Sequence, residues 1–175
     1  MSKNQPVSWS RVRYCPNPGT EDDMLELGMV VEFRTPKYWV VALALRADLD
    51  SHTERLDELA RVVIDRRDEV LTKELQRAMT VSEPGQVLNH LAASNPWSLS
   101  ISLPKKKQVS LNPEGTAEQA AQEATLAILV GELEEQRAYA GTKPTANRAA
   151  RASIWMQTPK TFFQALLPVR QTVSA

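Results

Sequence analysis

The chain has 175 residues, of which 42% are hydrophobic and 24% charged, a balance typical of a globular protein. Its 21 basic and 21 acidic residues cancel, so the net charge gives no reason to expect nucleic acid or an anionic membrane as a partner. No apolar run is long enough to predict a transmembrane helix, and the first residues lack the apolar stretch of a signal peptide. The single cysteine, Cys15, excludes a disulfide within the chain, and we expect a cytoplasmic protein.

The N-terminal part of the chain predicts three β-strands. Residues 7–14 alternate in polarity, so Val7, Trp9 and Arg11 should share one face of a strand. Residues 24–33 alternate as well, which predicts a single apolar face made of Leu25, Leu27, Met29, Val31 and Phe33. Residues 38–45 are apolar on both faces, as in a central strand that is covered on both sides. The short connection at residues 34–37 predicts that the second and third strands form an antiparallel hairpin.

The rest of the chain predicts helices and one more strand. Residues 51–79 start with a capping box, Ser51 and Glu54, and then carry apolar residues at helical spacing. A shorter helix opens after residues 83–85 and ends at residues 94–96, where Pro96 stops it. Residues 97–103 alternate, which predicts a fourth strand, and the lysine run at 105–107 indicates a solvated loop. A second long helix is predicted over residues 114–139, with an inner stripe rich in alanine and an acidic outer face.

These elements predict an α+β fold in which an antiparallel sheet of about four strands is packed by two long helices, with a C-terminal helical arm. We expect residues 1–140 to form the α+β domain and residues 141–175 to form a basic arm. The predicted core comprises Trp9, Leu27, Met29, Val41, Leu43, Leu59, Val63, Ile101 and Ile128.

Residue patterns that carry catalysis are scarce. The two histidines, His52 and His90, have no cysteine or carboxylate at ligand spacing, and the six glycines form no phosphate-binding loop. The sequence also lacks the Gly-x-Ser-x-Gly motif of a serine nucleophile. We therefore expect no metal and no cofactor, and the pattern favours a protein that is not an enzyme.

One arrangement of carboxylates indicates a different class, a metal-dependent nuclease. Such enzymes can use acidic residues on a strand to bind a divalent ion and a nearby cation to steady the scissile phosphate. Asp23, Glu32 and Arg34 could take these roles, although Arg34 stands where a lysine is usual and cannot act as a base. The competing interpretation is the solvated end of a hairpin.

The C-terminal 35 residues differ in composition from the rest, because they contain basic residues and no acidic ones. We predict that residues 144–170 form an amphipathic helical arm with Trp155, Phe162 and Phe163 as partner-binding anchors and with Arg148 and Arg151 steering association. Docking of this arm on the acidic helix of the same chain is an equally weighted alternative. A protein partner is expected through the arm, nucleic acid has weak support, and no membrane contact is expected.

Residues 10–18, Ser-Arg-Val-Arg-Tyr-Cys-Pro-Asn-Pro, resemble the opening of a bacterial domain-of-unknown-function family whose genes often lie beside HipA-like kinase genes. Members continue with an acidic turn and a strand of the type Glu-x-x-Asn-x-Gly-Val-x-Leu. Residues 23–31 match its glycine with Gly28, but Glu26 stands where asparagine is usual. The resemblance covers about residues 7–135 and excludes the basic tail.

The family implies no established activity and no catalytic residues. Its gene neighbourhood implies a mobile-element, toxin–antitoxin or phage-defence setting, which is an association and not a mechanism. The working hypothesis is a non-enzymatic protein-interaction subunit of a bacterial complex, with the metal-dependent nuclease as the alternative.

Overall fold

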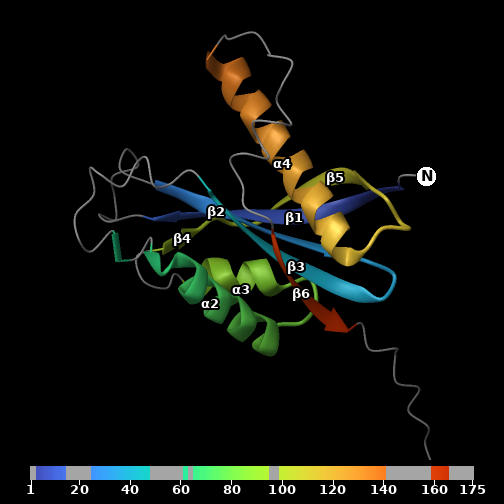
Figure 1. The fold of residues 1–175 in the computed structure, drawn as a ribbon, viewed down its shortest axis with the longest axis horizontal. Helices are drawn as coiled ribbons and strands as arrows, with labels where there is room; N and C mark the ends of the chain where they lie inside the picture. The colour runs from blue at the N-terminus through green and yellow to red at the C-terminus, as the bar shows by residue number, and fades with distance from the viewer. Residues whose placement is uncertain are drawn as a thin grey trace, which may run out of the picture.

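The computed structural model describes residues 3–14, 25–47, 61–62, 65–94, 99–140 and 159–165, and every structural statement below concerns these residues. The elements in chain order are β1 (Lys3–Tyr14), β2 (Leu25–Arg34), β3 (Tyr38–Leu45), α2 (Arg67–Val81), α3 (Val87–Ser94), β4 (Leu99–Ile101), β5 (Lys105–Leu111), α4 (Ala117–Ala140) and β6 (Lys160–Ala165). Figure 1 shows their arrangement. The predicted α+β class is confirmed.

A six-stranded antiparallel sheet forms the centre of the fold. The strand order is β4-β1-β2-β3-β6, and β5 also pairs with β1. Because residues 3–9 of β1 pair with β5 and residues 12–14 pair with β4, these two strands follow one another along the same edge of the sheet. Helices α2 and α3 cover one face, and α4 crosses the other (Figure 1). The fold therefore has two apolar cores, an α2/α3-side core and an α4-side core.

The sheet has two strands that the sequence pattern did not predict. The lysine run predicted as a loop belongs to β5, whose exposed first half carries the lysines and whose second half buries Val109 and Leu111. Residues 160–165, predicted as part of a helical arm, form β6 instead. Thr161, Phe162 and Phe163 have side chains that favour a pleated surface, and β3 offers them an edge to pair with.

Several predictions fall partly outside the described residues. Helix α2 overlaps the predicted 51–79 helix and continues to Val81, whereas the capping box at Ser51 and Glu54 lies outside the described residues. The remainder of the predicted arm also lies outside. Seven predicted core residues are buried, and they are Trp9, Leu27, Met29, Val41, Leu43, Ile101 and Ile128. Leu59 and Val63 are not among the described residues. No helix in the described ranges is long and apolar enough to cross a membrane.

A β-bulge in β2 overturns the prediction of a single apolar face for that strand. Val12 pairs with Gly28 and Arg13 pairs with Glu26, so Leu27 is the extra residue. Leu27 therefore packs in the α2/α3-side core while Met29 packs in the α4-side core. Gly28 is needed at this point, because a Cβ atom there would overlap the carbonyl oxygen of Ala44 on β3.

Helix α4 begins with a capping box that holds its first turn. The backbone N–H of Gln119 donates to the Thr116 hydroxyl, and the Gln119 side chain accepts from the Thr116 N–H, at 3.2 and 3.0 Å. Small residues then let the helix approach the sheet closely, since Ala120, Ala121 and Ala124 are all buried against it.

Candidate interaction edge and buried polar sites

Strand β6 carries two of the three aromatic residues that the sequence had singled out as partner anchors, Phe162 and Phe163. It pairs antiparallel with β3, and Phe162 lies opposite Val41 while Phe163 lies opposite Val40. Since Val41 faces the α2/α3-side core and Val40 faces the α4-side core, the two phenylalanines point to opposite faces of the sheet. Phe162 is partly buried against the α2/α3-side core.

Phe163 instead belongs to an exposed aromatic pair at the end of the sheet. Its ring lies 5.5 Å from the ring of Tyr38, centre to centre, with a tilt of 58° between the planes. Both residues keep about two-fifths of their surface exposed, 42% for Phe163 and 40% for Tyr38. A tilted pair of this kind is favourable in itself, and it leaves apolar surface in contact with solvent.

The charge of β6 is engaged within the chain. Lys160, the only charged residue of this strand, lies with its Nζ 2.5 Å from Oδ1 of Asp68 on α2. This ion pair lowers the pKa of Asp68, with Lys160 as its main cause. Strand β6 is thus made of aromatic, polar and small residues, and its one charged side chain, Lys160, points toward α2.

Glu32 and Arg34, the two described residues of the nuclease alternative, lie in different environments. Glu32 is buried, with 1% of its surface exposed, whereas Arg34 is exposed at the end of β2. Asp23 lies outside the described residues. Arg148, Arg151 and Trp155, predicted for partner binding, lie outside them too.

The structure gives Glu32 a role that the sequence pattern did not indicate. Its Oε2 accepts a hydrogen bond of 3.0 Å from the backbone N–H of Leu88, in the first turn of α3. A carboxylate is favoured there, because the first N–H groups of a helix have no partner within it. The turn through Pro84 and Gly85, where Gly85 has a φ of 94°, brings the start of α3 to this point.

Burial outweighs this stabilisation of the charged carboxylate. Desolvation raises the pKa of Glu32 above its ordinary value, and the N–H of Leu88 and the indole of Trp39 offset part of that rise. Of these two donors, only the N–H of Leu88 makes a hydrogen bond of ordinary geometry to Glu32. Neither Oε1 of Glu32 nor Nε1 of Trp39 has such a bond. The site therefore holds one buried carboxyl group, and no cation among the described residues forms an ion pair with it.

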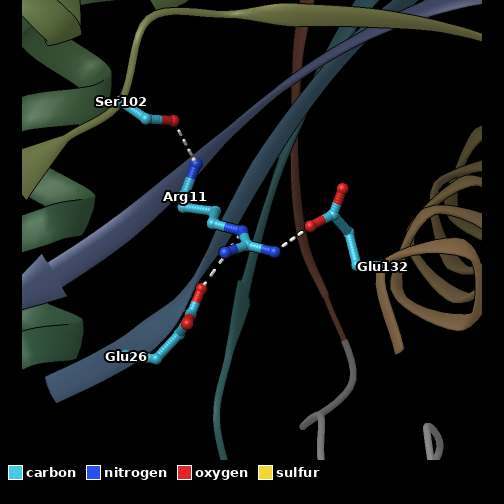
Figure 2. A network of polar contacts seen from close by, with 4 residues as sticks. All are labelled: Arg11, Glu26, Ser102 and Glu132. Carbon is cyan, nitrogen blue, oxygen red and sulfur yellow. Dashed lines mark hydrogen bonds and ion pairs between the residues drawn. The ribbon is translucent and has the colours of Figure 1, made fainter. Parts of the chain in front are cut away.

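A second polar site lies on the opposite face, where Arg11 of β1 contacts two carboxylates (Figure 2). Arg11 Nε lies 3.4 Å from Oε1 of Glu26, and its Nη2 pairs with Glu132 of α4. The backbone N–H of Arg11 donates to the Ser102 hydroxyl at 2.9 Å. These contacts join β1, β2, α4 and the segment after β4 at one point. The signal that could have revealed this site is Gly28, because a glycine inside a strand often marks a bulge.

The β4/β5 edge of the sheet is chemically unlike the β6 edge. Its exposed residues include Lys105, Lys106 and Lys107, and Lys105 lies over the ring of the buried Trp9 at 5.3 Å from the ring centre. Lysines along an edge strand discourage pairing with another strand. The sheet thus has one edge with charged residues and one edge with exposed aromatic residues.

Within the described ranges, no group of three histidine, cysteine or acidic side chains is placed to hold a metal ion. Comparisons with protein-family models, with curated proteins and with solved structures found no match to this chain.

Proposed function

We propose that this chain is a non-enzymatic protein-interaction subunit of a bacterial complex and that β6 supplies its contact surface. The observation that carries the proposal is the exposed aromatic pair of Tyr38 and Phe163 beside the outer edge of β6. Large aromatic side chains supply much of the binding energy at interfaces when they are desolvated. The resemblance described above makes a toxin–antitoxin or phage-defence setting part of the proposal.

The geometry supports an edge contact better than the helical arm that the sequence predicted. An edge strand presents backbone N–H and C=O groups without partners, and an extended segment can satisfy them. The lysines that would discourage such pairing lie on the opposite edge, and Lys160 is engaged with Asp68. Because no described strand pairs with the outer side of β6, this edge combines backbone groups available for pairing with apolar side chains.

Photo-cross-linking in the bacterium that carries the gene tests this proposal. The photoreactive residue p-benzoylphenylalanine would replace Tyr38 in the full chain, and in a matched control it would replace Val81, an exposed apolar residue at the end of α2. We expect position 38 to give a discrete protein adduct, identifiable by mass spectrometry, that position 81 does not give. Identical adducts from both positions, or none from position 38, would contradict the proposal.

The nuclease alternative has its own test. The purified chain is incubated with plasmid DNA and with RNA in Mg²⁺ or Mn²⁺, beside a Glu32→Gln variant that retains its circular dichroism spectrum. We expect no cleavage from either protein. If the native chain cleaves nucleic acid and the variant does not, the nuclease alternative is supported and the proposed interaction function is contradicted.

A further inference from the structure

The hydrogen bonds of β3 establish which backbone groups of β6 face outward. The N–H of Thr35 donates to the carbonyl of Tyr38, and the N–H of Arg46 donates to the carbonyl of Leu27, so Tyr38 and Arg46 direct their backbone groups toward β2. Because backbone direction alternates along a strand, the odd-numbered residues 39, 41 and 43 direct theirs toward β6.

The register of β3 and β6 then divides the residues of β6 into two sets. Residues 39, 41 and 43 lie opposite residues 164, 162 and 160, which therefore form the hydrogen-bonded pairs with β3. The backbone N–H and C=O groups of Thr161, Phe163 and Ala165 point away from β3. No other described strand pairs with this side of β6.

We propose that the outer edge of β6 pairs with β6 of a second copy of this chain, antiparallel and about a two-fold axis at Phe163. This inference rests on the proposed function, since it names the partner of the same edge. In this register Phe163 lies opposite the partner's Phe163, and Thr161 lies opposite the partner's Ala165. Every outward-facing backbone group in these pairs meets another outward-facing group, so the antiparallel order of the sheet continues across the axis.

The side chains suit this pairing because they are self-complementary. The two Phe163 rings meet directly across the axis on the α4 side, each beside its own Tyr38, and such cross-strand aromatic pairs are favourable. Lys160 does not lie opposite the partner's Lys160, because the axis places the two lysines at opposite ends of the paired segment. Each Lys160 also keeps Asp68 as its counter-charge.

The other edge of the sheet explains why we choose a two-fold pairing. A head-to-tail contact would set β6 against β5 of the next copy, where Lys105, Lys106 and Lys107 are exposed. Such a head-to-tail contact forms a ring only if its rotation closes, and otherwise leads to open filaments. The lysines on β5 disfavour the head-to-tail contact, which favours pairing of β6 with β6 of a second copy.

Sedimentation velocity and light scattering over a concentration series test the inference on the full chain. We expect a species of twice the 19.5 kDa of one chain. Phe163→Lys sets two ammonium groups across the axis and should raise the dimer dissociation constant about tenfold or more. Thr161→Pro should do the same, because it removes an outward N–H and no hydrogen bond to β3.

Leu103→Lys is the matched control, because Leu103 is an exposed apolar residue far from β6 in the chain, in the connection from β4 to β5. It should leave the dissociation constant unchanged. Cross-linking tests the register independently of these variants: in a Cys15→Ser background, Phe163→Cys should couple to its copy through a short bis-maleimide much more efficiently than Thr161→Cys. This measurement decides the matter if Phe163→Lys or Thr161→Pro shows an altered circular dichroism spectrum.

Three results would overturn the inference: a monomer at every concentration, a dimer that none of these variants weakens, or equal cross-linking at 161 and 163. A monomer that still forms the Tyr38 cross-link with a different protein overturns the second copy as partner and leaves the proposed function standing. A chain that neither dimerises nor cross-links at Tyr38 overturns both.

Discussion

Both faces of the sheet contain buried or partly buried charged side chains, and the two faces stabilise them differently. On the α2/α3 side, Glu32 accepts a hydrogen bond from a backbone N–H at the start of α3 and has no ion-pair partner in the part of the chain that the structure describes. On the α4 side, Arg11 lies between Glu26 and Glu132, and the exposed fractions of these three side chains are 17%, 27% and 13%. One face uses a helix terminus and nearly complete burial, and the other uses opposite charges and partial exposure.

This difference shows how each arrangement deals with the desolvation penalty of its charged groups. Backbone amides carry only partial charges, so a fully buried carboxylate keeps much of its desolvation penalty, and the pKa of Glu32 is raised. An ion pair at the margin of a core offsets desolvation with direct attraction and remaining solvent contact. The first arrangement should respond to pH, and the second should respond to loss of a partner.

The bulge beside Gly28 places Glu26 and Glu32 on opposite faces of the sheet. Disrupting this bulge should have the largest effect on the free energy of unfolding. Without the extra residue, Glu26 and Glu32 would share a face, since they are an even number of residues apart. A Gly28→Ala side chain overlaps the Ala44 carbonyl, which belongs to the backbone and cannot swing away. We expect a loss on the order of 3 kcal/mol in the free energy of unfolding, measured by urea denaturation.

Gly131→Ala is the control for that experiment. Its Cβ would meet only the amine end of Lys107, which is flexible, and alanine favours a helix. This variant should be unchanged or more stable by about 0.5–1 kcal/mol. Equal losses from both glycine variants would show that the bulge has no special role.

Removal of Arg11 should have the next largest effect. Arg11→Met keeps the apolar stem but leaves Glu26 and Glu132 close together without a cation. We expect a loss of about 2 kcal/mol in the free energy of unfolding, less than for a fully buried pair because all three groups retain some exposure. The triple variant Arg11→Met, Glu26→Gln, Glu132→Gln should recover most of this loss; failure to recover would mean that packing, not charge, explains the effect.

Glu32 should give a smaller effect that depends on pH. Its pKa is raised in the folded state from an ordinary value of 4.5. The folded chain therefore binds this proton more tightly than the unfolded chain, so the native protein gains stability relative to Glu32→Gln as the pH falls through the folded-state pKa. The gain should be complete below about pH 4.5, the ordinary pKa of this carboxyl group, and should disappear as the pH rises through the folded-state pKa. A stability difference that does not vary between pH 8 and pH 4 would contradict this account.

The ion pair that connects β6 to α2 should give the smallest effect. Asp68 and Lys160 are each about half exposed, so Asp68→Asn should cost only about 0–1 kcal/mol, and less in high salt. Because the pKa of Asp68 is lowered in the folded state, its contribution is present above an ordinary pKa of 3.8 and is lost as the pH falls through the folded-state value. Hydrogen exchange of the β6 amides should become faster in Asp68→Asn. The control, Glu69→Gln, removes the Lys73 ion pair within α2 and should leave β6 unchanged.

Much of the fold could be predicted because local periodicity reports burial. The alternation of β1 correctly placed Trp9 and Val12 on opposite faces, and the apolar residues of β3 correctly indicated a strand covered on both sides. The alanine stripe of α4 likewise indicated the face that packs on the sheet. These patterns need only neighbouring residues.

Prediction was wrong where pairing with distant strands overrides the local pattern. A run of lysines has low β-propensity, yet β5 forms because β1 offers it a complete ladder. Phe162 and Phe163 were singled out by composition, but a helix would have placed them side by side, whereas pairing with β3 sends them to opposite faces. The sequence thus singled out Phe162 and Phe163 but not their strand geometry, and it did not single out Tyr38.

The sequence alone determines which segments bury apolar side chains, and the order of its predicted strands and helices indicates an α+β protein. Tertiary structure alone decides which partner each charge receives. Arg11 meets Glu132 from 121 positions away, Glu32 meets the N–H of Leu88 from 56 positions away, and Lys160 meets Asp68 from 92 positions away. The physical reason is that periodicity arises between near neighbours, whereas the desolvation of a charge depends on whatever the packed elements bring beside it.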